Sequence, residues 1–337
     1  FSDSLNSWLL LSLLFISSLT MFMSGLVANF EYDLKKIIAL STLSQLGLMM
    51  SILALGEAML AFFHLLMHAL FKALLFMCAG CIIHNMNNCQ DIRYMGSLVM
   101  FLPLTSSFFN ICNLALCGLP FLSGFYSKDL ILEFMSMSYM NFYIYFIFYI
   151  SIGLTVMYSI RLMFYTMFGD FNSLNYFLIK DSSEYMLKGM GGLIFLVILG
   201  GGVSSWLVFP TPYFICLPFM MKMMVMLMVI LGGFIGYLVS NISYNDYSKS
   251  IKFYGLSFFL STMWNLNYLS TFGMVYYFLS FGEKLNSYTD QGWSEYYGSQ
   301  NIFLGMISSS SFLQKIFMNN IKVFLTLFLI WICLLFF

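Results

Sequence analysis

The sequence predicts an all-α protein, a polytopic transmembrane helix bundle. Hydrophobic residues make up 61% of the 337 residues and charged residues only 8%, whereas soluble domains carry about 25% charged residues. Apolar runs of about 20 residues, the length that crosses the hydrocarbon core, recur along the chain. The formal net charge is zero, so there is no basic field of the kind that nucleic-acid binding requires.

Eight apolar runs are candidate spans, and one of them is broken. They are 7–28, 35–55, 58–83, 103–118 continuing in broken form to about 137, 141–168, 189–209, 221–241 and 319–337. The region between the last two is less clear, because its charge-free stretch 254–281 is interrupted by Asn, Ser and Thr. That stretch either crosses the membrane or lies along it.

The basic residues gather on one side of this arrangement. Loops on that side hold Lys35, Lys36, Arg93, Lys180, Lys188, Lys249 and Lys252, and the other side holds only Lys222. Positive charge marks the side of synthesis. We therefore expect the loop between the first two spans to face the cytoplasm or an organelle matrix.

Three ionisable residues share one stripe of the span 58–83. His64, His68 and Lys72 are spaced by four and four, which stacks them on one helix face. Ionisable side chains inside a bilayer are costly and are functional-site candidates by default. A proton or ion pathway is the favoured interpretation. Interior polar residues that merely satisfy one another, and a metal site, are the alternatives.

A helix break precedes a second candidate cation. In GLPFLSGFYSKD, Pro120 and the flanking glycines disfavour a continuous helix, and Lys128 follows where the helix resumes. Transporters use such breaks to place ion sites. The alternative is a surface loop with a lysine whose charge reaches water. Asp129 and Glu133 are four residues apart and are expected to face one side together.

Smaller polar and small-residue patterns mark the remaining spans. Ser41 and Ser44 belong to a polar band in the span 35–55, suited either to holding water or to joining helices. Glycines are expected to mark close helix packing; they are Gly191, Gly192, Gly200, Gly201, Gly202, and the pair Gly232 and Gly236. The seven cysteines show no paired framework, and Cys78 and Cys81 are interpreted as small apolar fillers.

Several motifs together carry a family resemblance. The runs DLKKIIALSTLSQLGLMM, HLLMHALFKALLFMCAGCIIHNMNNCQDIRYMG, PLTS and GLPFLSGFYSKDLILE resemble the antiporter-like membrane subunits of respiratory complex I. The late segment DQGWSEYYG is similar to arthropod members. The resemblance covers essentially the whole chain and matches the later part of the family pattern, so the family's first half is absent from this sequence.

The resemblance implies an architecture. It implies an antiporter-like bundle over 1–241, with a broken helix. It also implies a lateral amphipathic helix along the inner membrane face over 242–318 and a C-terminal anchoring span over 319–337. The lateral helix would contact a neighbouring antiporter-like subunit, among other membrane-arm subunits and lipids. The implied location is the mitochondrial inner membrane.

The resemblance also implies roles for particular residues. Lys72 matches the lysine at the centre of a half-channel, His64 and His68 match nearby histidines, and Lys128 matches a lysine toward the exit side. Together they would relay protons, coupling NADH:ubiquinone electron transfer to proton pumping. The resemblance implies no cofactor in this chain: FMN, iron–sulfur clusters and quinone would belong to partner subunits.

Two other functions remain open from the sequence. One is a subunit of a multi-subunit cation/proton antiporter, which shares these motifs. The other is a structural scaffold in which the polar residues only join helices.

Overall fold

The structure, a computed structural model, describes residues 4–137, 142–173, 179–181, 183–242, 252–318 and 320–336. Most of these residues are helical, and the only extended pairing among them is an isolated bridge between Asp33 and Asp91. The predicted all-α class is confirmed. The chain divides into two compact units, Phe1–Trp264 and Asn265–Phe337.

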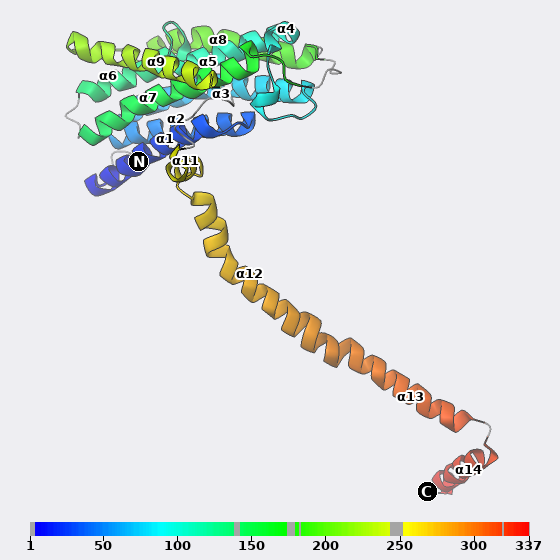
Figure 1. The fold of residues 1–337 in the computed structure, drawn as a ribbon. Helices are drawn as coiled ribbons and strands as arrows, with labels where there is room; N and C mark the ends of the chain where they lie inside the picture. The colour runs from blue at the N-terminus through cyan, green and yellow to red at the C-terminus, as the bar shows by residue number, and fades with distance from the viewer. Residues whose placement is uncertain are drawn as a thin grey trace. The chain divides into compact units, whose positions relative to one another are not determined.

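The first unit is a bundle of long helices (Figure 1). Its helices are α1 (Ser7–Phe30), α2 (Leu34–Ala54), α3 (Ala58–Asn85), α4 (Leu98–Phe101), α5 (Pro103–Cys117), α6 (Ser123–Met137), α7 (Phe142–Met163), α8 (Glu184–Val208), α9 (Phe219–Ser240) and α11 (Tyr254–Ser261). A short 3₁₀ turn, Ile92–Tyr94, precedes α4, and a π-helical turn, Phe164–Phe168, extends α7. The helices match the predicted spans closely.

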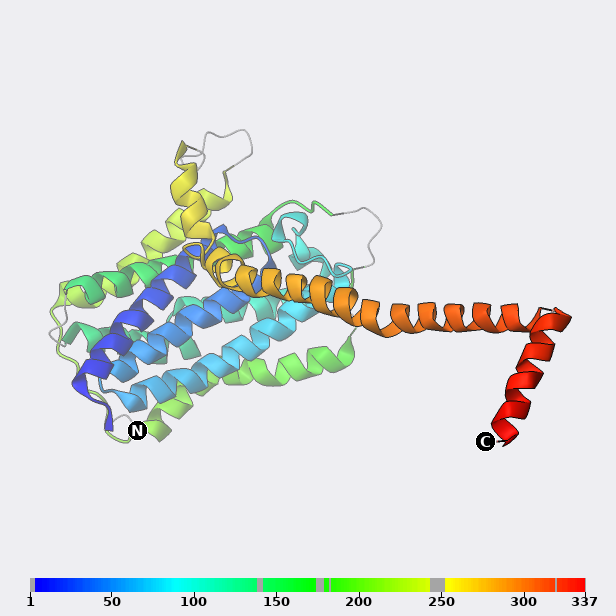
Figure 2. The same ribbon diagram turned by 90° about the horizontal axis from the view of Figure 1, so that it is seen from below.

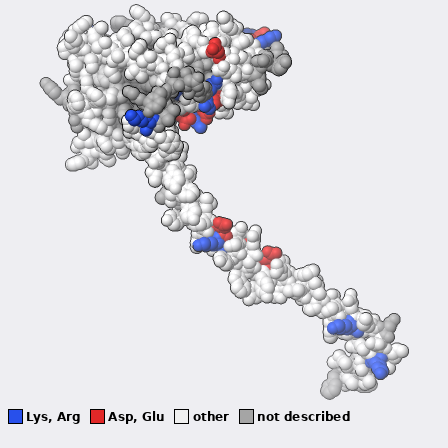
Figure 3. Space-filling view, viewed as in Figure 1, with Lys and Arg blue, Asp and Glu red and all other residues white. Residues whose placement is uncertain are grey.

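Six helices of the described residues are long and apolar enough to cross a membrane: α1, α2, α3, α7 with its π-helical turn, α8 and α9. Figure 2 shows α1, α2 and α3 running side by side. The predicted broken span is the pair α5 and α6, of 15 residues each, separated at Gly118–Leu122. The bundle face seen in Figure 3 is almost without charged side chains over most of its area, as a surface exposed to lipid requires.

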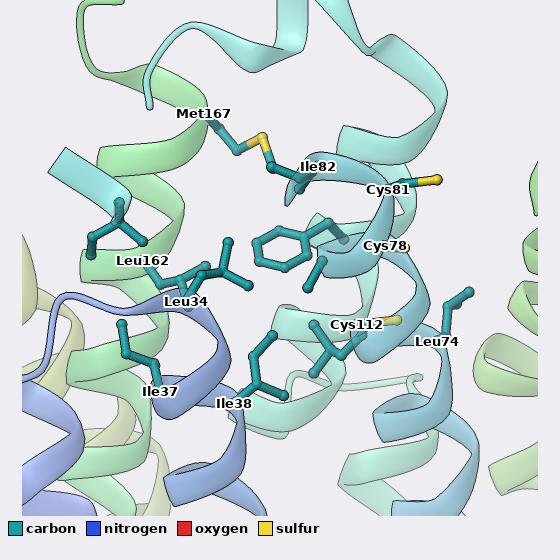
Figure 4. Packing of buried hydrophobic residues seen from close by; sticks show 14 of the residues in the cluster. Leu34, Ile37, Ile38, Leu74, Cys78, Cys81, Ile82, Cys112, Leu162 and Met167 are labelled. Atoms are coloured by element: carbon teal, nitrogen blue, oxygen red, sulfur yellow. The ribbon is translucent and has the colours of Figure 1, made fainter. Parts of the chain in front are cut away.

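The core of the bundle lies where α2, α3, α5 and α7 meet. Figure 4 shows its apolar side chains interdigitating; those labelled there are Leu34, Ile37, Ile38, Leu74, Cys78, Cys81, Ile82, Cys112, Leu162 and Met167. Each of these is at most 3% exposed. Cys78 and Cys81 are free thiols within this core, which agrees with their interpretation as apolar fillers.

Backbone pairing joins the loop before α2 to the loop after α3. Leu34 N–H donates to Gln90 O (2.9 Å), and Ile92 N–H donates to Tyr32 O (3.0 Å). Burial alone would raise the pKa of Asp91, but the hydrogen bonds and charge of Arg93 hold that pKa below its usual value. This pairing fixes the start of α2 against the end of α3, the two helices that carry most of the candidate site.

Two glycines bring α9 into backbone contact with α7. A Cβ at Gly232 would lie 2.4 Å from Gly153 O, and a Cβ at Gly236 would lie 2.7 Å from Met157 O. The predicted close packing of this pair is confirmed. The same expectation was wrong for Gly191 and Gly192, which have nothing within 4 Å; at these positions glycine reflects no contact within the chain.

The second unit is an extended helical stretch. It runs through the π-helical turn Tyr268–Gly273, α12 (Met274–Leu285), further π-helical turns at Asn286–Trp293 and Tyr296–Gln300, and α13 (Asn301–Phe317), and it ends with α14 (Ile321–Phe336). The helical stretch Tyr268–Phe317 and α14 are inclined by 101°. None of the described side chains of this unit is buried within the chain.

The stretch 254–281 does not form one crossing helix. Helix α11 ends at Ser261, and Met263, Trp264 and Asn265 all have left-handed backbone angles, with φ between 54° and 59°. Such angles are unfavourable for residues with a Cβ and do not belong to an α-helix. The Asn, Ser and Thr residues that interrupt the apolar stretch 254–281 in the sequence therefore coincide with a turn in the backbone.

The glycine contacts between α7 and α9 are testable by adding a methyl group. We expect Gly232→Ala to destabilise the bundle by about 1–3 kcal/mol, because the new Cβ meets backbone that cannot rotate away. The matched control Gly191→Ala places the same methyl group in open space and should change stability by less than about 0.5 kcal/mol. Thermal unfolding in detergent measures both; equal effects would contradict the contact.

Candidate functional site

The stripe on α3 faces the interior of the bundle. His64, His68 and Lys72 are 1%, 9% and 4% exposed. Helix α3 packs against α2, α5, α6 and α8, so protein surrounds it on several sides. The expected burial of the three residues on one face is confirmed.

Lys72 is held by a hydroxyl of α2. Its Nζ donates a hydrogen bond to Ser41 Oγ. The Ser41 hydroxyl in turn donates to Ile38 O (2.7 Å), which leaves its oxygen free to accept from the lysine. Ser44 donates to Ser41 O (2.9 Å) and has no hydrogen bond to Lys72. Of the two predicted serines, Ser41 therefore contacts the lysine directly.

His64 connects α2 with α6. Its Nδ1 lies 2.9 Å from Ser127 Oγ and its Nε2 lies 3.2 Å from Gln45 Oε1. The amide oxygen can only accept, so Nε2 carries a proton when this contact is made. Nδ1 of the neutral ring then accepts from Ser127. Nε2 can give up its proton and Nδ1 can take one up, each in exchange with a neighbouring hydroxyl or water.

His68 lies between the other two members of the stripe. Its ring centre is 6.3 Å from that of His64, and its edge meets Phe71. Within the described part of the chain, His68 Nε2 is buried and has no hydrogen-bond partner. A buried polar atom of this kind normally binds water. The position suits a water molecule along the stripe.

Lys128 occupies the break between α5 and α6. Its side chain is 2% exposed, and its Nζ donates to Leu116 O (3.3 Å) and Thr155 Oγ1 (2.9 Å). Gly118, with φ of +81°, ends α5 and turns the chain. Because α5 ends there, the Leu116 carbonyl has no helix partner and can accept from the lysine. The negative end of the α5 dipole also favours the ammonium group.

Asp129 and Glu133 follow Lys128 on α6 and are both partly buried. Within the described ranges, neither carboxylate forms an ion pair; the salt bridges found there involve other residues. Lys72 and Lys128 likewise have no carboxylate within ion-pair distance. Their hydrogen bonds go only to hydroxyl and carbonyl groups, although the neighbouring Asp129 also interacts electrostatically with Lys128.

The structure adds residues that the sequence reading did not select. Ser127 precedes Lys128 and contacts His64, and Thr155 on α7 accepts from Lys128. Tyr158 lies one turn beyond Thr155, 2% exposed. The two residues on α7 could have been found from the sequence, because Ser151, Thr155 and Tyr158 are spaced by four and three, as on one helix face, within an otherwise apolar span.

The arrangement can bind and exchange protons. It gathers two lysines, two imidazoles and several hydroxyls from α2, α3, α6 and α7, and each of these groups can donate or accept a proton or a hydrogen bond. Among the described residues, no group of three or more His, Cys, Asp or Glu side chains is arranged to hold a metal ion. Burial makes the protonated form of a lysine costly, so a nearby charge can change its protonation.

Comparison with known proteins identifies the family of the chain. Residues 158–337 match the family described as NADH dehydrogenase subunit 5 C-terminus, and residues 1–157 match NADH:quinone oxidoreductase/Mrp antiporter, TM. NADH-ubiquinone oxidoreductase chain 5 of Anopheles quadrimaculatus is 55% identical over 96% of this chain and 56% of its own length. The Aedes aegypti protein of the same name is 54% identical over 98% of this chain and 57% of its own length.

A solved structure shares the fold. The Mrp complex from Dietzia sp. DQ12-45-1b contains a chain that superposes with a TM-score of 0.63 at 19% identity, over 90% of this chain and 34% of that one. The present chain spans a little more than half the length of the curated relatives it matches. Both halves of the chain match models of the same kind of membrane subunit, and the chain belongs to the NADH dehydrogenase subunit 5 family.

Proposed function

We propose that this chain is the proton-translocating part of an antiporter-like subunit of respiratory complex I, located in the mitochondrial inner membrane. The observation that carries the proposal is the buried polar cluster in which Lys72 binds Ser41, His64 bridges Gln45 and Ser127, and Lys128 occupies the helix break. In this proposal the cluster relays protons, and the assembled complex uses NADH:ubiquinone electron transfer to drive them.

Charge coupling between the buried lysines supports the mechanism. With no carboxylate within ion-pair distance of either lysine in the described ranges, an ammonium at Lys72 is destabilised when a second cation forms nearby. Each lysine interacts electrostatically with one histidine of the stripe, Lys72 with His68 and Lys128 with His64, so the charge on one lysine is passed on to the other through the stripe. Adding a proton at one lysine therefore favours release at the other, and the histidines lie along the path between them.

The redox chemistry is proposed to take place elsewhere. We assign FMN, the iron–sulfur clusters and the quinone to partner subunits, as the family resemblance implies. The contribution of this chain is to hold protons away from bulk water, to exchange them between fixed groups and to respond to charge.

The cation/proton antiporter and the scaffold are the competing functions. The family model that covers 158–337, and the names of the curated relatives, favour complex I over the antiporter. The solved Mrp structure shows a shared fold only. A scaffold does not require buried lysines. Burying two of them without an ion pair costs free energy, and helix packing by itself gives no reason for that cost.

We further propose that the second unit contacts a neighbouring antiporter-like subunit and lies along the inner membrane face. Its helices expose large apolar side chains, among them Phe278, Phe303 and Ile307. Its charges are few and separated along the helix (Figure 3). An apolar helix without partners in its own unit is expected to be covered by another protein or by lipid.

Neutralising the central lysine tests the relay. In membranes where subunit content confirms assembly, Lys72→Met should slow NADH-driven proton pumping by roughly tenfold, about 1.4 kcal/mol in barrier, because methionine keeps the side-chain length but holds no proton. Lys72→Arg should also impair pumping, since arginine keeps its proton at working pH.

The matched control is Lys36→Met, which removes a lysine whose side chain is 62% exposed. It should leave the proton-to-electron ratio and turnover unchanged. Normal ratios and turnover in both Lys72 variants would identify Lys72 as structural and reject the relay. Sodium-dependent exchange that continues without NADH would favour the antiporter.

Chemical labelling tests the placement of the second unit. A single cysteine replacing Glu295 should react with a membrane-impermeant maleimide only from the inner side, together with one replacing Lys35. A cysteine replacing Lys222 should react from the outer side. A photo-crosslinker at Phe303 should capture another membrane-arm subunit. Labelling of the Glu295 position from the outer side would contradict the lateral placement.

A further inference from the structure

Tyr158 is a buried hydroxyl that the relay described above does not use. It lies on α7, is 2% exposed, and within the described residues its hydroxyl forms no hydrogen bond. The hydroxyls of Ser44 and Ser41 lie beside it and interact with it. A buried hydroxyl without a hydrogen-bond partner is unfavourable, and it normally indicates a water position or an alternative arrangement of the hydrogen bonds.

One neighbour of Tyr158 leads to Lys72. Ser41 accepts the hydrogen bond of the Lys72 ammonium and gives its own proton to Ile38 O. Ser44 gives its proton to Ser41 O and keeps its oxygen free to accept. The Tyr158 hydroxyl can therefore donate a hydrogen bond to Ser44 Oγ. Alternatively, it can take the place of Ser41 as the acceptor of the hydrogen bond from Lys72.

The other side of Tyr158 leads to Lys128. Thr155, three residues earlier on the same face of α7, accepts from Lys128 Nζ at 2.9 Å. Ser159, the next residue after Tyr158, lies 2.9 Å from the Cys117 thiol, and Cys117 follows Leu116, the other acceptor of Lys128. Polar groups of α5 and α7 thus extend from Tyr158 to the second lysine.

The stripe on α3 forms a separate route. It passes from Lys72 along His68 to His64 and ends at Ser127, next to Lys128. The α7 route shares only its two lysine ends with that stripe. Removing a histidine therefore leaves the α7 route intact, and removing the Tyr158 hydroxyl leaves the histidines intact.

We propose, on the basis of the proposed function, that the Tyr158 hydroxyl provides a second proton connection between Lys72 and Lys128, parallel to the histidine stripe. The proton balance is simple. The phenolic oxygen receives a proton from the Lys72 side as its own proton passes toward Thr155, with water between hydroxyls that do not touch. One proton leaves the Lys72 ammonium and one arrives at the neutral Lys128 amine, and the phenol is unchanged.

The test combines single and double variants in the assembled complex. Tyr158→Phe keeps the ring and removes the hydroxyl, so turnover should fall by roughly two- to tenfold, because one of two routes is lost. In a His68→Gln background the same change should lower turnover nearly to the level of Lys72→Met. The ratio of rates in H₂O and D₂O should rise in Tyr158→Phe, since proton transfer becomes more rate-limiting; a packing role would not raise it.

The matched control is Tyr145→Phe on the same helix, whose hydroxyl contacts Met221 Sδ at 3.5 Å, away from both lysines. It should leave turnover and the isotope ratio unchanged. Should Tyr158→Phe fail to assemble, Ser44→Ala removes the facing hydroxyl instead and should slow turnover in the His68→Gln background.

The outcomes separate the two proposals. If Lys72→Met impairs pumping but neither Tyr158→Phe nor Ser44→Ala adds to His68→Gln, the second connection is rejected and the relay stands. If Lys72→Met is also normal, the proposed function itself fails. Additive loss with a raised isotope ratio supports the connection.

Discussion

The break between α5 and α6 is the constraint on which the rest of the site depends. A helix that stops inside the membrane leaves carbonyl groups without partners, and in lipid these must be satisfied by protein or water. Here Lys128 satisfies one of them, Leu116 O, and α7 provides a second acceptor through Thr155. The broken helix therefore does more than interrupt a span, because it creates a place where a buried ammonium can be stable.

Close packing around the break keeps this place rigid. A Cβ at Gly124 would lie 1.8 Å from Ala115 O, and one at Gly201 would lie 2.6 Å from Ser123 Cα. Helix α6 thus starts directly against the end of α5, and α8 covers that start. Because no side chain separates these backbones, Ser127 and Lys128 take positions that are fixed relative to His64 on α3. Positions held in this way suit proton exchange, which depends strongly on the distance between groups.

Much of the fold and part of the site follow from the sequence, for physical reasons that differ between elements. Hydrophobic length predicts the spans, and the spacing of four and four predicts that His64 and Lys72 share a buried face. Partners between helices do not follow in this way: that Ser41 rather than Ser44 meets Lys72, or that Thr155 meets Lys128, depends on the rotation of each helix against its neighbour. Local sequence does not determine that rotation. The failed expectation at Gly191 has the same origin, since a glycine in a span marks close approach only where another backbone faces it.

The two units place different demands on the chain. In the first, most polar side chains inside the bundle have partners. Eight buried polar atoms of the described residues have none, and two of them, His68 Nε2 and the Tyr158 hydroxyl, adjoin the lysine cluster. In the second, apolar side chains are exposed along the whole described helix, which is unfavourable in water for a chain on its own. Two of the unsatisfied polar atoms lie beside the groups that would exchange protons, and uncovered apolar surface lies where no part of the same unit packs. The first unit thus has its polar groups inside and the second has its apolar groups outside, which is the division expected under the proposed function, in which proton exchange is internal and the driving force comes from neighbours.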